Sequence, residues 1–135
     1  MKAEWLDRAL IIGPYITLVL NEKQFHKAMS HCQRRLSDHG DWIKSPHSDA
    51  TVHFLENQSD ELCCIVALRV KKKTDPNGIV GLLIHESVHI WQAFKRRIGE
   101  DTPSDEFEAY AIQTISQRLI SAYSNLTTNK QKKKR

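Results

Sequence analysis

Residues 79–94 read Ile-Val-Gly-Leu-Leu-Ile-His-Glu-Ser-Val-His-Ile-Trp-Gln-Ala-Phe, and this stretch decides the fold predicted for the chain. Apolar residues fall almost all the way round a 3.6-residue wheel, a pattern typical of a buried helix. The ionisable side chains in the stretch are those of His85, Glu86 and His89. Because polar groups inside an apolar helix need partners, these three side chains indicate a common site. The alternative is two satisfied core histidines beside a paired glutamate.

His85 and His89 are four residues apart, so a helix places them on one face and can point two imidazole nitrogens at a single ion. Glu86 lies about 100° round the helix from His85, where its carboxylate can act on a water bound to that ion. This H-E-x-x-H arrangement is typical of zinc hydrolases. We therefore expect zinc as the cofactor, at about one ion per chain, and Glu86 as the catalytic base.

A third ligand is expected from the helix that follows. Thr102, Pro103 and Asp105 predict the start of this helix, with Thr102 as the N-cap. On a helical wheel Glu108 falls within the apolar stripe, whereas Glu106 falls nearly opposite. A carboxylate that faces a core must be neutral, paired or bound to metal, so Glu108 is the preferred metal ligand and Glu106 the alternative.

The spacing of these residues resembles that of a known family. Eighteen residues separate His89 from Glu108, and H-E-x-x-H followed by that interval and a glutamate is similar to one large branch of the gluzincin metallopeptidases. Residues 108–111, Glu-Ala-Tyr-Ala, resemble that branch's Glu-Gly-Phe-Ala signature. The resemblance implies that His85, His89 and Glu108 bind zinc. Other zincins carry Glu-x-x-Ala with the first glutamate as ligand, a pattern that fits residues 106–109.

The resemblance covers residues 82–111, and the chain is too short for the large multidomain enzymes of that branch. It is more similar to minimal zincin domains, including short phage and prophage proteins with H-E-x-x-H-I-W-Q and E-F-E-A-Y segments. The activity implied is that of a zinc metallopeptidase with a peptide or protein substrate. Zinc lowers the pKa of its bound water to about 7, and Glu86 would accept the proton.

Two further residues are candidates to line this site. Gln92 shares the helix face of the histidines, and Tyr110 lies on the ligand helix; a packing or surface role is the alternative for both. An alternative function is a zincin-fold binding or assembly protein of the phage-encoded type, which uses zinc as a structural ion without turnover. Two histidines and a glutamate leave a fourth coordination position open to water, which favours the enzyme.

Length and charge predict one domain, residues 1–129, and a basic disordered tail, residues 130–135. The net charge is +4, but the tail carries five positive charges, so residues 1–129 carry a net charge of −1. A third function class is weak polyanion contact through this tail and through Lys71-Lys72-Lys73. The alternative is a solvated tail and a charged loop that discourages edge pairing.

Cysteine count and hydropathy predict a cytoplasmic protein without a membrane partner. Three cysteines with no C-x-x-C spacing favour a reducing compartment. No apolar run approaches the roughly 18 residues of a membrane helix, and no signal-peptide pattern opens the chain.

The remaining pattern predicts an α+β fold: a small mixed sheet, a buried zinc-binding helix and a following ligand helix, as in zincins. A sheet followed directly by the metal helix is the usual zincin order, in which an edge strand can hold an extended substrate. We expect helices over 2–10, 21–36, 79–94 and 103–123, with irregular chain over 37–49. Strands are expected over 15–20, 51–55 and 62–70, and the last two of these should form a hairpin.

Overall fold

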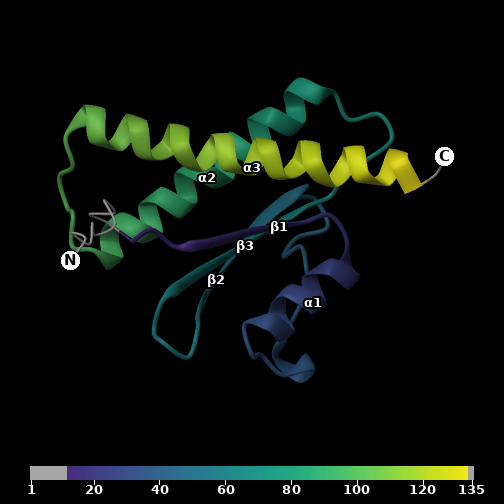
Figure 1. The fold of residues 1–135 in the computed structure, drawn as a ribbon, viewed down its shortest axis with the longest axis horizontal. Helices are drawn as coiled ribbons and strands as arrows, with labels where there is room; N and C mark the ends of the chain where they lie inside the picture. The colour runs from purple at the N-terminus through teal and green to yellow at the C-terminus, as the bar shows by residue number, and fades with distance from the viewer. Residues whose placement is uncertain (1–11, 134–135) are drawn as a thin grey trace, which may run out of the picture.

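The computed structural model describes residues 12–133 and has an α+β fold (Figure 1). A three-stranded sheet lies between one helix on one face and two long helices on the other. The helix predicted over residues 2–10 lies outside the described residues. In chain order the elements are β1 (Tyr15–Val19), α1 (Glu22–His31), a 3-10 turn (Leu36–Asp38), β2 (Ala50–Glu56), β3 (Leu62–Leu68), α2 (Pro76–Arg97) and α3 (Asp105–Lys133).

The sheet has the strand order β1-β3-β2 and is mixed, as predicted. β1 runs parallel to β3, with Tyr15 opposite Cys63, and β2 runs antiparallel to β3, with Ala50 opposite Leu68. Every residue of β3 is buried. This burial agrees with its unbroken apolar sequence, because a central strand covered on both faces does not alternate with polar residues. The predicted strands and the β2–β3 hairpin are confirmed, with ends that shift by one or two residues.

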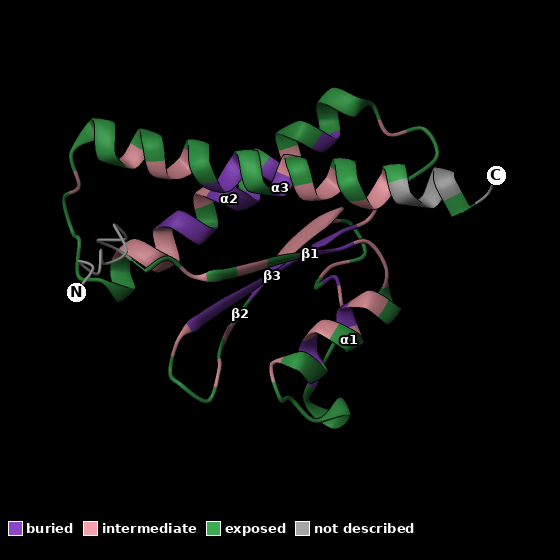
Figure 2. Cartoon of the chain, viewed as in Figure 1, coloured by how far each residue is buried: buried purple, intermediate pink, exposed green. Residues whose placement is uncertain are grey.

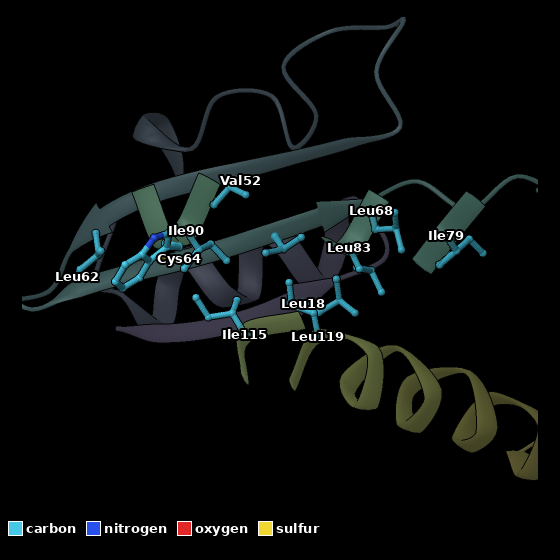
Figure 3. Packing of buried hydrophobic residues seen from close by; sticks show 12 residues of the cluster. Leu18, Val52, Leu62, Cys64, Leu68, Ile79, Leu83, Ile90, Ile115 and Leu119 are labelled. Carbon is cyan, nitrogen blue, oxygen red and sulfur yellow. The ribbon is translucent and has the colours of Figure 1, made fainter. Parts of the chain in front are cut away.

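Side chains alternate along β3 and so contribute to two separate cores. The core on the α1 face gathers Phe25, Met29 and Ile43 with Ile65 and Ala67 of β3. The larger core packs α2 and α3 against the opposite face of the sheet (Figure 3). Its buried members are Leu18, Val52, Leu62, Cys64, Val66, Leu68, Ile79, Leu83, Ile90, Trp91, Ile115 and Leu119.

Helix α1 begins as predicted and ends earlier than predicted. Asn21 is its N-cap and accepts a hydrogen bond from the Gln24 backbone N–H at 2.8 Å, while Gln24 Oε1 accepts from the Leu20 N–H at 2.7 Å. The expected continuation to residue 36 is wrong. The helix stops at His31 because Gln33 adopts the left-handed conformation, with φ of 60°, that commonly closes a helix.

Helix α2 carries the H-E-x-x-H segment and is buried on one side only, so the prediction of an all-round buried helix is wrong (Figure 2). Leu83 is fully buried, whereas its neighbour Ile84 is 42% exposed. The sheet covers one side of α2 and α3 crosses another, which leaves a third side in contact with solvent. His85 and His89 lie on that exposed side, and Glu86 is buried.

Helix α3 follows α2 and begins at Asp105. Its N-cap is Ser104 and not the predicted Thr102. Ser104 Oγ accepts a hydrogen bond from the Phe107 N–H at 3.3 Å, and the Ser104 carbonyl accepts one from the Glu108 N–H at 3.0 Å. Ile115 and Leu119 pack into the larger core as expected. The segment 130–135, for which disorder was predicted, is helical as far as Lys133.

The three cysteines are free thiols. Cys64 points into the larger core, where burial raises the pKa of its thiol to about 12. In the part of the chain from residue 12 to 133, no helix is both long and apolar enough to cross a membrane.

Candidate metal centre

His85 and His89 bring their Nε2 atoms within 3.2 Å of each other on the exposed side of α2. The four-residue spacing places the two side chains on the same side of the helix, one turn apart, as the sequence predicts. The two rings are close to perpendicular, at 76°, so their edges converge instead of stacking face to face. The pair therefore directs two nitrogens at one point in front of the helix.

Gln92 hydrogen-bonds to His89 and favours one tautomer of its ring. The Oε1 atom of Gln92 lies 3.1 Å from Nδ1 of His89, and an amide oxygen can only accept, so Nδ1 carries the hydrogen. Nε2 of His89 then accepts a hydrogen bond from Nε2 of His85 at 3.2 Å, so the hydrogen of His85 must move to Nδ1 before both Nε2 atoms can bind one ion. For His89 this is the tautomer that a metal-binding histidine needs, and a hydrogen bond from the other ring nitrogen to an acceptor is the usual way to hold it.

The separation of the two nitrogens fits a shared zinc ion. Zinc binds histidine nitrogen at about 2.0–2.1 Å in tetrahedral geometry, which places two such nitrogens about 3.3 Å apart. The 3.2 Å between the Nε2 atoms of His85 and His89 agrees with that value. The two histidines could thus act as ligands without a change of rotamer.

Glu86 lies beside this pair and is buried, with 6% of its surface exposed. Burial raises the pKa of its carboxyl group, while the charges of His85, His89 and Lys44 act in the opposite direction. A carboxyl group with a raised pKa next to two histidines is suited to take a proton from water.

Lys44 is the residue near Glu86 that sequence reasoning missed. It belongs to the irregular segment before β2, and its backbone N–H donates to Thr51 Oγ1 on that strand at 3.3 Å. It has no sequence spacing to the H-E-x-x-H segment, since only the tertiary fold brings this loop toward α2. No signal in the sequence could have found it.

Glu108 is not brought together with the histidine pair. Its Oε2 atom accepts a hydrogen bond from the Trp91 indole N–H at 2.8 Å and lies 3.9 Å from Lys95 Nζ. Trp91 points roughly 120° or more away from both histidines around α2. Across residues 12–133, no three His, Cys, Asp or Glu side chains gather closely enough to hold an ion. Glu106, the alternative ligand, is exposed, and the identity of the third ligand stays a prediction.

Of the two residues predicted to line the site, Gln92 contacts His89 directly. Tyr110 lies on α3 and is 62% exposed. A cavity of about 800 Å³ lies along β1 and α1, bordered by residues such as Ile16, Ala28 and Cys63, and does not include the histidine pair. His85 and His89 are both exposed, so the pair lies on an open surface of α2.

A second histidine pair was not visible from sequence. His26 and His39 are 13 residues apart, yet their Nδ1 atoms lie 2.8 Å apart and their rings stack. Nε2 of His39 donates to the Arg34 carbonyl at 3.2 Å, so Nδ1 of His39 accepts from His26. This pair ties the 3-10 turn to α1 and has a structural role.

The lysine cluster predicted as a polyanion contact lies in the loop between β3 and α2. Lys71, Lys72 and Lys73 are exposed, and Lys71 forms an ion pair with Asp49 at 3.1 Å. The cluster is therefore partly neutralised by the fold.

Comparison of the chain with protein-family models, with curated proteins and with solved structures finds no match.

Proposed function

We propose that this protein is a zinc-dependent hydrolase that cleaves peptide bonds, with His85 and His89 as metal ligands and Glu86 as the base. The observation that carries the proposal is the convergence of the two Nε2 atoms at 3.2 Å beside a buried glutamate with a raised pKa. A purely structural role for these residues would not explain why the histidine pair is exposed to solvent or why Gln92 holds one tautomer of His89.

The chemistry assigned to the chain is proton transfer. Bound zinc supplies a Lewis acid that makes a water acidic enough to attack a carbonyl near neutral pH. Glu86 would accept a proton from the attacking water and pass it to the leaving amine. Its raised pKa favours the first of these steps, because it makes the carboxylate a stronger base.

The arrangement of the sheet supports a peptide substrate. α2 follows β3 directly and packs against β2, which is the antiparallel edge strand of the described sheet. An edge strand can bind an extended peptide through its backbone groups. This order, an edge strand beside the metal helix, is the one that the zincin resemblance implies, and membership of that family is part of the proposal.

The second candidate is a binding or assembly protein in which zinc has a structural role. Two observations favour it: Glu108 is engaged by Trp91 and Lys95, and the histidine pair lies on an open surface. A partner protein would then supply the remaining ligands or cover the ion.

Hydrolysis of a peptide library by the zinc-loaded chain, read by mass spectrometry, separates the two candidates. For the enzyme we expect cleavage that a chelator stops and zinc restores. Glu86→Gln should keep the metal and lose roughly 100- to 10,000-fold in rate, whereas Glu100→Gln, a loop control, should behave as the wild type. Bound zinc with no cleavage of any library peptide would favour the binding protein, and cleavage unaffected by Glu86→Gln would contradict the role of Glu86.

A further inference from the structure

We propose that the free edge of β1 is a docking site for an extended, acidic peptide segment of a partner protein, which joins the sheet as a further strand. β1 lies at the edge of the sheet and pairs with β3 on one side. Within residues 12–133, no segment other than β3 forms backbone hydrogen bonds with Tyr15–Val19. An edge strand presents unpaired N–H and C=O groups, which can bind an added strand as the sheet binds its own. The docking site is separate from the histidine pair and needs no metal.

The sequence of β1 lacks the features that protect a free edge. Residues 15–19 read Tyr-Ile-Thr-Leu-Val, which are aromatic or aliphatic apart from one threonine and include no charged residue and no proline. Charged side chains, proline and bulges are the usual means by which proteins prevent unwanted pairing at an edge. A flat apolar edge without them is expected to be covered by another strand.

Cavities on both faces of the sheet accompany this edge. One of about 800 Å³ lies between β1 and α1, and a second of about 350 Å³ lies between β1 and α3. Figure 1 shows β1 running between these two helices. Ile16, Thr17 and Leu18 border both cavities, so both adjoin the middle of the strand. Because the side chains of an added strand alternate between the two faces, each cavity would receive every second side chain.

The cavities are lined mostly by apolar residues, and their charged residues are basic. Lys27 borders the cavity on the α1 side and Arg118 the cavity on the α3 side, and both are exposed. Among the described residues that border the two cavities, none is an aspartate or a glutamate. Neither Lys27 nor Arg118 forms an ion pair with a side chain that the structure describes. A peptide with an apolar centre and flanking carboxylates therefore complements the site.

A second copy of the chain fits this edge less well. Antiparallel pairing of two β1 strands would place α1 of both copies on one face of the joined sheet and α3 of both copies on the other. Each face would then gather two like charges, from the Lys27 residues or from the Arg118 residues, in cavities that no acidic residue borders. Because like charges disfavour association, the acidic peptide is the occupant that the charges favour.

Fluorescence anisotropy of a labelled octapeptide, Asp-Glu-Val-Val-Ile-Val-Glu-Asp, added to the full-length chain tests the docking site. Its counterpart Lys-Lys-Val-Val-Ile-Val-Lys-Lys has the same centre and the opposite charge, and should bind at least about tenfold more weakly. Lys27→Glu and Arg118→Glu should each weaken binding of the acidic peptide by about three- to tenfold. Lys23→Glu and Gln117→Glu alter exposed residues of the same helices that border neither cavity, and should change it by less than about twofold.

Hydrogen exchange of the backbone amides locates the bound peptide. The acidic peptide should slow exchange within residues 15–19 and leave residues 50–56 of β2, the opposite edge, unchanged. Thr17→Asp places a carboxylate on an exposed position in the middle of the edge and should abolish binding. Thr17→Asn has the same size without the charge and should retain most of the affinity.

Four results would overturn the docking site. Equal affinity for the two peptides, or unchanged affinity in both Lys27→Glu and Arg118→Glu, would remove the charge complementarity. No saturable binding of the acidic peptide up to about 1 mM would exclude the site itself. Slower exchange in residues 50–56 and not in 15–19 would place the peptide on β2, beside the metal helix, and would leave the proposed function standing. A wild-type dimer in sedimentation equilibrium that Thr17→Asp converts to a monomer would assign the edge to a second copy.

Discussion

Oε1 of Gln92 accepts a hydrogen bond from Nδ1 of His89 at 3.1 Å, and this contact decides which nitrogen of His89 is free for an ion. Replacing Gln92 by leucine removes the acceptor and lets the ring adopt the other tautomer or rotate. We expect Gln92→Leu to weaken zinc binding by roughly 10- to 100-fold, the usual effect of losing an outer partner of a ligand histidine.

The measurement is a competitive zinc titration beside Gln113→Leu, which alters an exposed glutamine on α3. Equal affinity in Gln92→Leu and in the wild type would mean that Gln92 does not orient the ligand.

Adjacent residues of α2 should differ sharply in their effect on stability. Leu83 is fully buried against the sheet and Ile84 is 42% exposed. Leu83→Ala should lower the free energy of unfolding by about 2–5 kcal/mol through lost burial and a cavity, whereas Ile84→Ala should lower it by less than about 1 kcal/mol. Urea denaturation measures both, and similar losses would contradict the orientation of α2 and with it the outward direction of the histidine pair.

Stability should fall in mildly acidic solution partly through His53. Burial lowers the pKa of this histidine, with Lys44 acting in the same direction and the hydrogen bond to the Trp42 carbonyl opposing them. The unfolded chain, with a histidine pKa of about 6.5, therefore binds a proton before the folded chain does. The stability present above about pH 6.5 is lost as pH falls through the folded pKa of His53.

Urea denaturation of the wild type should show this loss between about pH 7 and pH 5. The loss should be smaller in His53→Gln and unchanged in His31→Gln, an exposed control. A pH dependence identical in His53→Gln and the wild type would exclude His53 as a source.

The start of α3 provides a test of the capping residue. Ser104 Oγ accepts from the Phe107 N–H, so Ser104→Ala should destabilise the protein by about 0.5–2 kcal/mol. Thr102→Ala should have little effect, although Thr102 is the residue that the sequence predicts as the cap. Thermal unfolding of the two variants distinguishes them, and a larger loss in Thr102→Ala would reverse the assignment.

Elements with a strong local signal were predictable. The start of the helix near residue 21, the β2–β3 hairpin and the strand that begins at residue 62 depend on neighbours in sequence, and the structure confirms all three. The end of α1 was not predictable, because an apolar residue at position 36 continues the helical pattern while Gln33 has already left the helix. The spacing of apolar residues gives no information about a positive backbone φ.

The candidate site was predictable in part for the same reason. The histidine pair depends on one helical turn, and its convergence follows from spacing alone. The position of Glu108 depends on how α3 crosses α2. A helical wheel shows on which side of α3 Glu108 lies, but it does not show which residue of α2 Glu108 contacts. Lys44 and the His26–His39 contact are likewise products of tertiary packing.

Zinc content is the most direct test of the central claim that His85 and His89 share an ion. The wild type, His85→Ala, His89→Ala and the exposed control His47→Ala would be purified without chelators, supplied with zinc, desalted and analysed by mass spectrometry of the metal. We predict about one zinc per chain in the wild type and in His47→Ala, and none in the two ligand variants. A wild type without zinc, or ligand variants that retain it, would contradict the claim.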